Sequence, residues 1–211
     1  MKLDNPGLPE NLWEHLDGRL WHATARDDLH GIIADEEIRV TVGDRYVGSF
    51  SRNLGGVSLF DFGPSSEDVT NQFGNWCGWF GRQQEARVAV WLEIDRASVL
   101  ESLMDAEQTR KAWHRMTDQR LAESRMDKPK TLFIPGVEAC PIGPIPPVAV
   151  AGVLLIDQHD WNLFRQLGQP NNDTIQQIDA FEATLPAHED NPIVQTLLAG
   201  RRRARAKRSK E

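Results

Sequence analysis

The stretch RLWHATARDDLHGIIADEEIRV, residues 19–40, combines the pattern of a short strand with that of a helix. Behind two aspartates, which favour a helix start, apolar residues recur at the i, i+3 and i+4 spacing of one helical face. The residues ahead of them, LWHAT, are typical of a strand, on which alternate side chains point the same way. We therefore expect His22 and Thr24 to share one face of a strand that leads through a turn into a helix.

The rest of the chain alternates short β-branched and aromatic segments with turn residues and a few helical stretches. Strands are expected at 37–42, 46–52, 56–62, 86–95, 131–140 and 145–157, and helices at 96–126, 159–167, 173–184 and 192–206. Only one long helix separates the strands, whereas a doubly wound parallel sheet needs a helix at most crossovers. The sequence thus predicts an α+β domain.

An aromatic, glycine-rich segment, NQFGNWCGWFGRQQ at 71–84, interrupts this pattern. Its glycines argue against a regular element, and its tryptophans and phenylalanines argue against a solvated loop. Two interpretations stay open. The segment is either an aromatic plug over the core or a lid in which Trp76 or Trp79 stacks on a flat ring.

Length and composition favour one folded domain, over about residues 1–200. No apolar run reaches the roughly 18 residues needed to cross a bilayer, and the first ten residues do not resemble a signal peptide. We expect a cytoplasmic protein without a membrane partner. The two cysteines, Cys77 and Cys140, are too few for a disulfide framework. No histidine lies near either of them at metal-ligand spacing, so no metal site is expected.

Residues 201–211, RRRARAKRSKE, form a basic tail with seven cationic side chains and one acidic side chain. Without this tail the formal charge of the chain falls from −7 to −13. An acidic body is a poor general binder of nucleic acid, whereas the tail could contact phosphates locally. The competing interpretation is a solvated end that aids solubility.

Common nucleotide and hydrolase motifs are absent from the sequence. There is no GxGxxG, no GxxxxGK[ST], no GxSxG and no HExxH. The polar residues that remain as candidates are His22 with Thr24, a cluster of Ser49, Ser51 and Arg52, and a lone carboxylate, Glu138, in an apolar segment beside a Pro-Gly break.

Three segments in the same order resemble the ADP-ribosyltransferase fold. LWHATARDDLHGIIADEEIRV resembles its opening, where a strand-borne His-x-Thr or His-x-Ser precedes a small helix of the form LxxII. GSFSRN, at 48–53, is similar to the strand that lines the nicotinamide-ribose pocket, and GVEACPIGPIPPVAVAGVLLID, at 136–157, to the closing glutamate, Ile-Pro-Pro turn and apolar strand. The resemblance covers about residues 19–157 and extends to poly-ADP-ribose polymerases, RNA 2′-phosphotransferases and DNA-targeting ADP-ribosyltransferase toxins.

This resemblance implies a split antiparallel sheet with flanking helices and NAD bound in a cleft as substrate. It implies that Glu138 stabilises the positive charge that builds on the ribose when the nicotinamide–ribose bond breaks. His22 and Thr24 would hold the adenosine ribose, and catalysis would depend on His22 through this positioning.

The same resemblance assigns NAD binding to further residues of the middle of the chain. Arg52 could pair with the pyrophosphate, because a guanidinium is a planar and permanently charged donor. Trp79 could cover the ribose. The other residues assigned to NAD binding are Tyr46, Ser49 and Ser51.

Some positions depart from the pattern of the family or leave alternatives open. Glu93, in the strand segment WLEID, competes with Glu138, but no break in that strand would expose it to a cleft. Arginine-directed members carry a second glutamate two residues before the catalytic one, where this chain has Gly136. Tyr46 lies just ahead of the SFSR segment, whereas polymerase-type members carry a tyrosine within the second motif.

The sequence therefore favours an NAD-dependent ADP-ribosyltransferase of bacterial or phage type, in the manner of a toxin, with nucleic acid as one candidate acceptor. A catalytically inactive binding or inhibitory protein on the same fold, and an enzyme like the RNA 2′-phosphotransferases, remain as alternatives. The sequence does not identify a protein partner.

Overall fold

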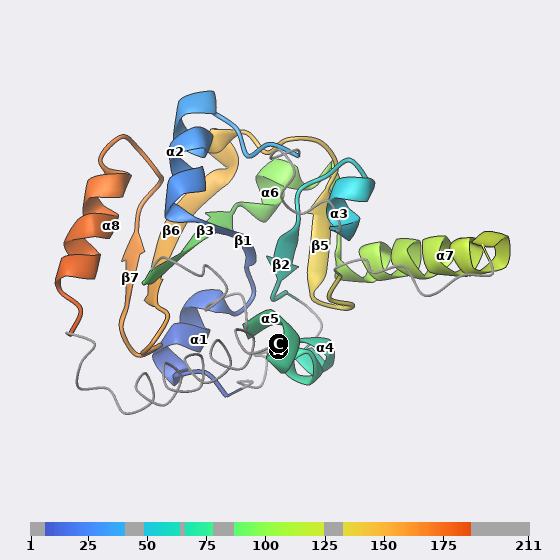
Figure 1. Cartoon of the computed structure of the whole chain (residues 1–211), viewed down its shortest axis with the longest axis horizontal. Coiled ribbons are helices and arrows are strands. Elements are labelled where there is room, and N and C mark those ends of the chain that lie inside the picture. Colours follow the sequence, from blue (N-terminus) through green and yellow to red (C-terminus); the bar gives the residue numbers. More distant parts are fainter. Residues whose placement is uncertain (1–6, 41–48, 64–65, 78–86, 125–132, 187–211) are drawn as a thin grey trace, which may run out of the picture.

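The computed structural model describes residues 7–40, 49–63, 66–77, 87–124 and 133–186 (Figure 1). Its centre is one seven-stranded sheet with the strand order β4-β5-β2-β1-β3-β6-β7. The strands are β1 Leu20–Thr24, β2 Leu59–Asp61, β3 Val88–Ile94, β4 Leu103–Met104, β5 Glu138–Pro141, β6 Val150–Asp157 and β7 Phe164–Leu167. Every neighbouring pair is antiparallel, which agrees with the expected α+β class.

The longest ladder joins β3 to β6 and forms the middle of the molecule. Its register runs from Val88 opposite Asp157 to Ile94 opposite Val150, with an irregularity at Glu93 and Ile94. Both strands are almost wholly apolar, as expected for strands that are covered on both faces.

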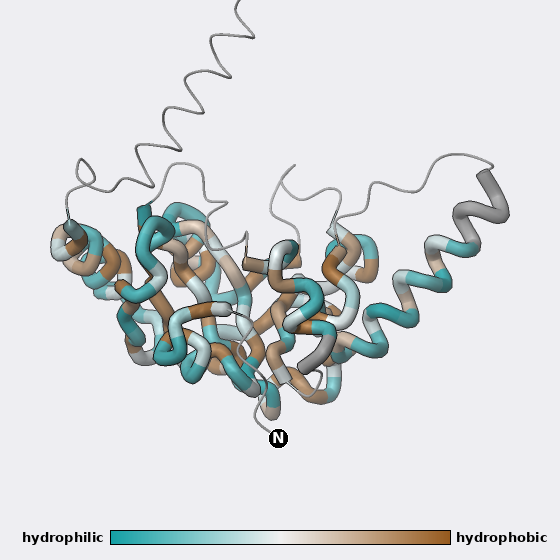
Figure 2. The backbone as a smooth tube through the Cα atoms, turned by 90° about the horizontal axis from the view of Figure 1, so that it is seen from below, coloured by the Kyte–Doolittle hydropathy of each residue, from teal (hydrophilic) through white to brown (hydrophobic). Residues whose placement is uncertain are grey.

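Two hydrophobic clusters cover the two faces of the sheet. On one face, aliphatic side chains of the strands pack against α2 Arg26–Asp35 and α8 Thr174–Ala183 through Leu29, Ile175 and Ile178. The other cluster is aromatic and includes residues of α1 Glu10–Leu16, α4 Ser66–Asn71 and α5 Phe73–Trp76. The hydrophobic colours of Figure 2 accordingly concentrate inside the molecule.

The sheet splits between β1 and β2. The β1–β2 register consists of Leu20 opposite Asp61 and Trp21 opposite Phe60, whereas β1 stays paired with β3 as far as Thr24. The last three residues of β1 therefore have no ladder partner from β2. This split places His22 beside the start of β2.

The remaining helices are α3 Phe50–Asn53, α6 Arg96–Val99, α7 Ala106–Ser124 and a 3₁₀ turn at Pro147–Ala149. Helix α7 contacts β5 and β4 near its first turns and then extends away from the sheet (Figure 1). Its described length is coloured mostly hydrophilic in Figure 2.

Two of the expected elements are wrong in type. Residues 46–52 were expected to be a strand. Of these, 49–52 are described, and Ser49 is the extended N-cap of α3, which begins at Phe50. Residues 159–167 were expected to be helical, but they contain β7, which pairs with β6. In both places a tertiary contact decides the conformation: Phe50 is buried in the core, and β7 fills the free edge of β6.

Other expectations hold only in part. The expected helix over 96–126 is interrupted by β4, and the segment 71–84, whose glycines argued against a regular element, contains α5. The segment 37–42 contributes an isolated bridge between Ile38 and Ile145, and its end is not described. The expected helix at 192–206 and the basic tail lie outside the described residues.

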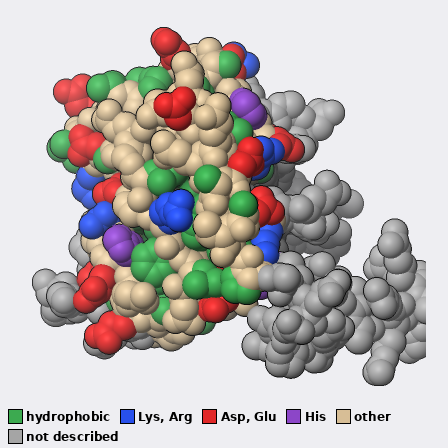
Figure 3. Space-filling view, turned by 90° about the vertical axis from the view of Figure 1, so that its left-hand side faces the viewer, with side chains coloured by type: hydrophobic (Ala, Val, Ile, Leu, Met, Phe, Trp, Pro, Cys, Tyr) green, Lys and Arg blue, Asp and Glu red, His purple; other side chains and the backbone are tan. Residues whose placement is uncertain are grey.

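None of the described helices combines the length and the apolar character that crossing a membrane requires. On the side of the molecule that carries α8, acidic and basic side chains are interspersed (Figure 3).

Candidate functional site

Glu138 is the first residue of β5, and its carboxylate is buried beside the split of the sheet, with 6% of the residue exposed. Oε1 accepts hydrogen bonds from Ser51 Oγ and Ser58 Oγ, each at 2.7 Å. Oε2 accepts one from the backbone N–H of Ile134 at 3.1 Å. The carboxylate is thus held by three donors: one from α3, one from the residue just before β2, and one from the segment that precedes β5.

These surroundings act on the Glu138 carboxyl in opposite directions. Burial raises its pKa above the ordinary value for glutamate, and this is the largest effect. The hydrogen bonds from Ser51, Ser58 and Ile134 favour the charged form and lower the pKa. The three donors therefore limit the cost of an ionised carboxylate at a buried position.

His22 is fixed at the same split by a hydrogen bond between its Nδ1 and the backbone oxygen of Ser58, at 3.0 Å. A carbonyl oxygen can only accept, so Nδ1 carries the proton. Burial lowers the pKa of His22, against smaller opposing effects of the Ser58 carbonyl and the charge of Asp28. The neutral ring then offers Nε2 as a hydrogen-bond acceptor, and no partner for Nε2 is found among the described residues.

Ser58 links the two groups, and the sequence analysis did not select it. Its hydroxyl bonds the Glu138 carboxylate, and its carbonyl bonds the His22 ring. The available signal is a serine between Val57 and Leu59 in an otherwise apolar strand segment. Such a polar residue needs a partner when it is partly buried.

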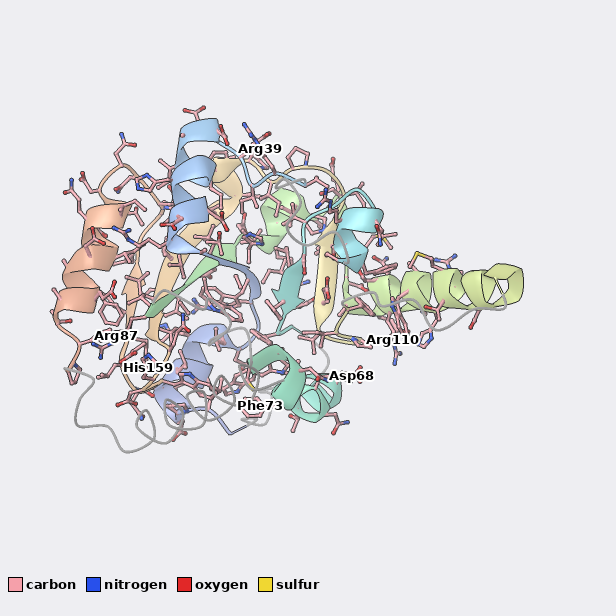
Figure 4. The ribbon with its side chains drawn as sticks, viewed as in Figure 1. Arg39, Asp68, Phe73, Arg87, Arg110 and His159 are labelled. Atoms are coloured by element: carbon pink, nitrogen blue, oxygen red, sulfur yellow. The ribbon has the colours of Figure 1, made fainter. Side chains whose placement is uncertain are left out.

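The turn before β5 explains how the carboxylate reaches this position. Gly136 has φ of 75°, a left-handed conformation that favours glycine. A Cβ at position 136 would overlap the side chain of Asp68, which comes from α4 (Figure 4). A glutamate at 136, as in arginine-directed transferases, would not fit this turn.

Of the other residues that the sequence assigned to NAD binding, Ser51 contacts Glu138 within the described part of the chain. Its hydroxyl donates to the Glu138 carboxylate, whereas Ser49 is the N-cap residue of α3 and its side chain makes no capping hydrogen bond within the described residues. Arg52 is half-buried on α3, and Thr24 is buried on β1 opposite Val90. Tyr46 and Trp79 lie outside the described residues.

Trp76 belongs to the core, so the lid interpretation is wrong for this residue. Its ring is fully buried, packs against Trp13 and Phe62, and donates its Nε1–H to the Val69 carbonyl at 2.7 Å. At Trp76 the segment is the aromatic plug. For Trp79 both interpretations stay predictions.

Glu93, the competing carboxylate, takes part in an ion pair. Its Oε2 lies 3.0 Å from Arg19 Nη1, and both side chains are partly exposed. Glu93 faces a cation, whereas Ser51, Ser58 and the Ile134 backbone, which donate to Glu138, are neutral. A neutral environment leaves the charge of Glu138 available to a ligand.

Two further ionisable residues, Cys140 and Asp157, have structural roles. Cys140 lies behind Ser51, and burial raises the pKa of its thiol to about 11, so it stays protonated and unreactive at neutral pH. At the other end of the sheet, Asp157 accepts hydrogen bonds from Arg87 and the His159 backbone N–H, which ties β3 to the β6–β7 connection (Figure 4). Within the described residues, no three potential metal ligands come together.

No protein-family model, curated protein or solved structure matches this chain. The function must therefore be inferred from the chemistry of the Glu138 site.

Proposed function

We propose that the protein is an NAD-dependent ADP-ribosyltransferase that acts through Glu138 at the split of the sheet. The observation that carries the proposal is the buried carboxylate, held by three neutral donors and joined through Ser58 to the ring of His22. The antiparallel sheet that opens between β1 and β2 also suits the expected ADP-ribosyltransferase-like fold.

The chemistry requires a fixed negative charge. When the bond between the ribose C1′ and the nicotinamide nitrogen breaks, its electron pair leaves with nicotinamide, and positive charge develops on the ribose. A carboxylate that is already in place stabilises this charge more in the transition state than in the ground state. Glu138 needs no rearrangement for this role because its three donors fix its orientation.

His22 would bind and orient the dinucleotide. Its Nε2 accepts hydrogen bonds while Nδ1 is committed to Ser58, so its ligand must be a donor, such as a ribose hydroxyl. Correct placement of the ribose against Glu138 then contributes through proximity. Arg52, one residue beyond Ser51, is the proposed partner of the pyrophosphate.

One observation favours a second candidate, a binding or inhibitory protein that uses the same site. Burial raises the pKa of Glu138, and a protonated carboxyl could bind a ligand but could not stabilise a developing cation. The acceptor of ADP-ribose is proposed to be nucleic acid. An enzyme like the RNA 2′-phosphotransferases would differ in directing its chemistry at an RNA phosphate, whose oxygen attacks the ribose C1′ as nicotinamide leaves.

The test is incubation of the protein with NAD at several pH values and measurement of free nicotinamide. We expect release that increases as Glu138 ionises. Glu138→Gln should bind NAD nearly as tightly while lowering kcat by about a hundredfold or more, the scale of one lost electrostatic contact.

Glu93→Gln is the matched control, since it removes the other candidate carboxylate, which lies on β3, two strands away from the β5–β2 pair that holds the site. It should leave kcat close to that of the parent protein. Tight NAD binding without any nicotinamide release would establish the binding protein instead, and a loss confined to Glu93→Gln would move the catalytic role to Glu93.

A further inference from the structure

Ser58 stands at the point where the sheet opens. If the β1–β2 ladder continued in register, Ser58 would lie opposite Ala23, but the ladder ends at Trp21 and Phe60. The Ser58 carbonyl is bonded by the ring of His22 instead. A side chain of β1 thereby replaces a backbone contact between the two strands.

The hydroxyl of Ser58 faces the neighbouring strand on its other side. Phe60 lies opposite Glu138 in the β2–β5 ladder, so Ser58, two residues earlier, is the diagonal neighbour of Glu138 on the same face. The diagonal position explains how Ser58 Oγ comes within 2.7 Å of the carboxylate.

The donors are shared unequally between the two carboxylate oxygens. Oε1 accepts two hydroxyl hydrogen bonds, which fills its two lone-pair positions, whereas Oε2 accepts only one hydrogen bond from the described residues. Oε2 therefore keeps one unfilled lone-pair position among the described residues, while the two serine hydroxyls hold Oε1 in place.

We propose that Ser58 is a positioning residue of the transfer reaction: its hydroxyl locks Oε1 of Glu138, its carbonyl locks the His22 ring, and Oε2 is the oxygen that meets the ribose. This inference rests on the proposed function. One residue thus sets the spacing between the group that orients the sugar and the group that stabilises its charge. The hydroxyl also supports the charged form of Glu138, since it is one of three donors to the carboxylate.

Ser58→Ala tests the contact with Glu138 apart from the contact with His22, because it removes the hydroxyl and keeps the carbonyl. We expect kcat for NAD cleavage to fall about tenfold to a hundredfold, the range for a lost hydrogen bond to a charged group. KM should stay within about twofold of the parent value, because the His22 contact is retained. The acidic limb of the pH profile should move to higher pH, since the carboxylate loses a donor.

Two variants serve as controls. Ser58→Thr keeps the hydroxyl on a residue suited to a strand, and it should restore most of kcat and the parental pH profile. Ser98→Ala removes another serine hydroxyl that donates to a carboxylate, that of Asp95, the N-cap residue of α6. This contact is exposed, and its loss should change neither quantity. An unchanged kcat and pH profile in Ser58→Ala, or a loss that Ser58→Thr does not restore, would overturn the inference.

A titration of the Glu138 carboxyl by ¹³C NMR keeps the inference testable apart from turnover. If the parent protein releases no nicotinamide, the proposed function fails, but the locking of Glu138 by Ser58 still predicts a higher carboxyl pKa in Ser58→Ala than in the parent. Equal carboxyl pKa values in the two proteins would refute the contact itself.

Discussion

Burial favours the uncharged form of both ionisable residues of the site, His22 and Glu138. It lowers the pKa of His22 and raises the pKa of Glu138. For His22 this suits a role as a neutral acceptor, whereas for Glu138 it opposes the charged form that the proposed chemistry needs. Ionisation of Glu138 is therefore expected to lower the free energy of unfolding.

Glu138→Gln should reveal this cost. The pKa of Glu138 is higher in the folded than in the unfolded protein, so protonation of this carboxyl stabilises the fold. The stabilisation is complete below about pH 4.3, the ordinary pKa of glutamate. It is lost as the pH rises through the pKa of the folded protein. Glutamine keeps the shape of the side chain but does not titrate. We expect the parent to lose stability relative to Glu138→Gln as the pH rises from 4 to 8.

The measurement is the free energy of unfolding by denaturant at a series of pH values. Glu93→Gln is again the control, because Glu93 is paired with a cation and not buried among neutral groups. A difference between the parent and Glu138→Gln that stays constant over this pH range would contradict a raised pKa of Glu138.

At the scale of elements, the site depends on a close approach between the segment after α3 and β5. Gly56 forms a bridge with Ile142 and donates its N–H to the Ser51 carbonyl at 3.0 Å. A Cβ at this position would overlap the Pro141 carbonyl and Cys140 Sγ. Only glycine lets this segment bring Ser51 and Ser58 to the carboxylate.

Gly56→Ala should therefore destabilise the protein and disturb the site together. Overlap with backbone atoms costs about 1–3 kcal/mol, or several degrees in Tm. Gly74→Ala in α5 is the control, since a Cβ there meets nothing within 4 Å, and its Tm should stay the same or rise slightly. Thermal unfolding of both variants checks the prediction, and equal Tm values would show that the segment can move away from β5.

The sequence predicted those elements whose pattern is set locally. The strand with His22, the helix behind it, the apolar strand β6 and helix α8 follow from residue periodicity. The types of 46–52 and 159–167 were missed because a buried Phe50 and a free strand edge decided them. Ser51 and Glu138 were selected, but Ser58 was not, since its role arises from a ladder that stops early.

At the scale of the whole molecule, the sheet consists of two parts that meet at the site. One part is β4-β5-β2, and the other is β1-β3-β6-β7; their ladder contains only two residue pairs. An ion pair between Arg96 and the buried Asp61 and the bond from His22 to Ser58 add contacts across this junction. The junction therefore both closes the fold and holds the proposed catalytic carboxylate.

Charge is also unevenly distributed over the chain, and this bears on the acceptor. The body carries a formal charge of −13, which repels nucleic acid, whereas residues 201–211 carry seven basic side chains and one acidic side chain. If the acceptor is nucleic acid, these basic residues are the main candidates for phosphate contacts. Each contact would release a counterion, so affinity for duplex DNA should fall with salt with a log–log slope of up to about −6.

Deletion of residues 201–211 should flatten this slope and weaken binding, with NAD cleavage in the absence of an acceptor unchanged because Glu138 and its donors are retained. The measurement is the affinity of the full and shortened proteins for duplex and single-stranded oligonucleotides over a range of salt concentrations. A scrambled tail of the same composition is the control, since counterion release depends on charge and not on sequence. Equal affinity and equal salt dependence of the full and shortened proteins would leave the tail without a role in binding the acceptor.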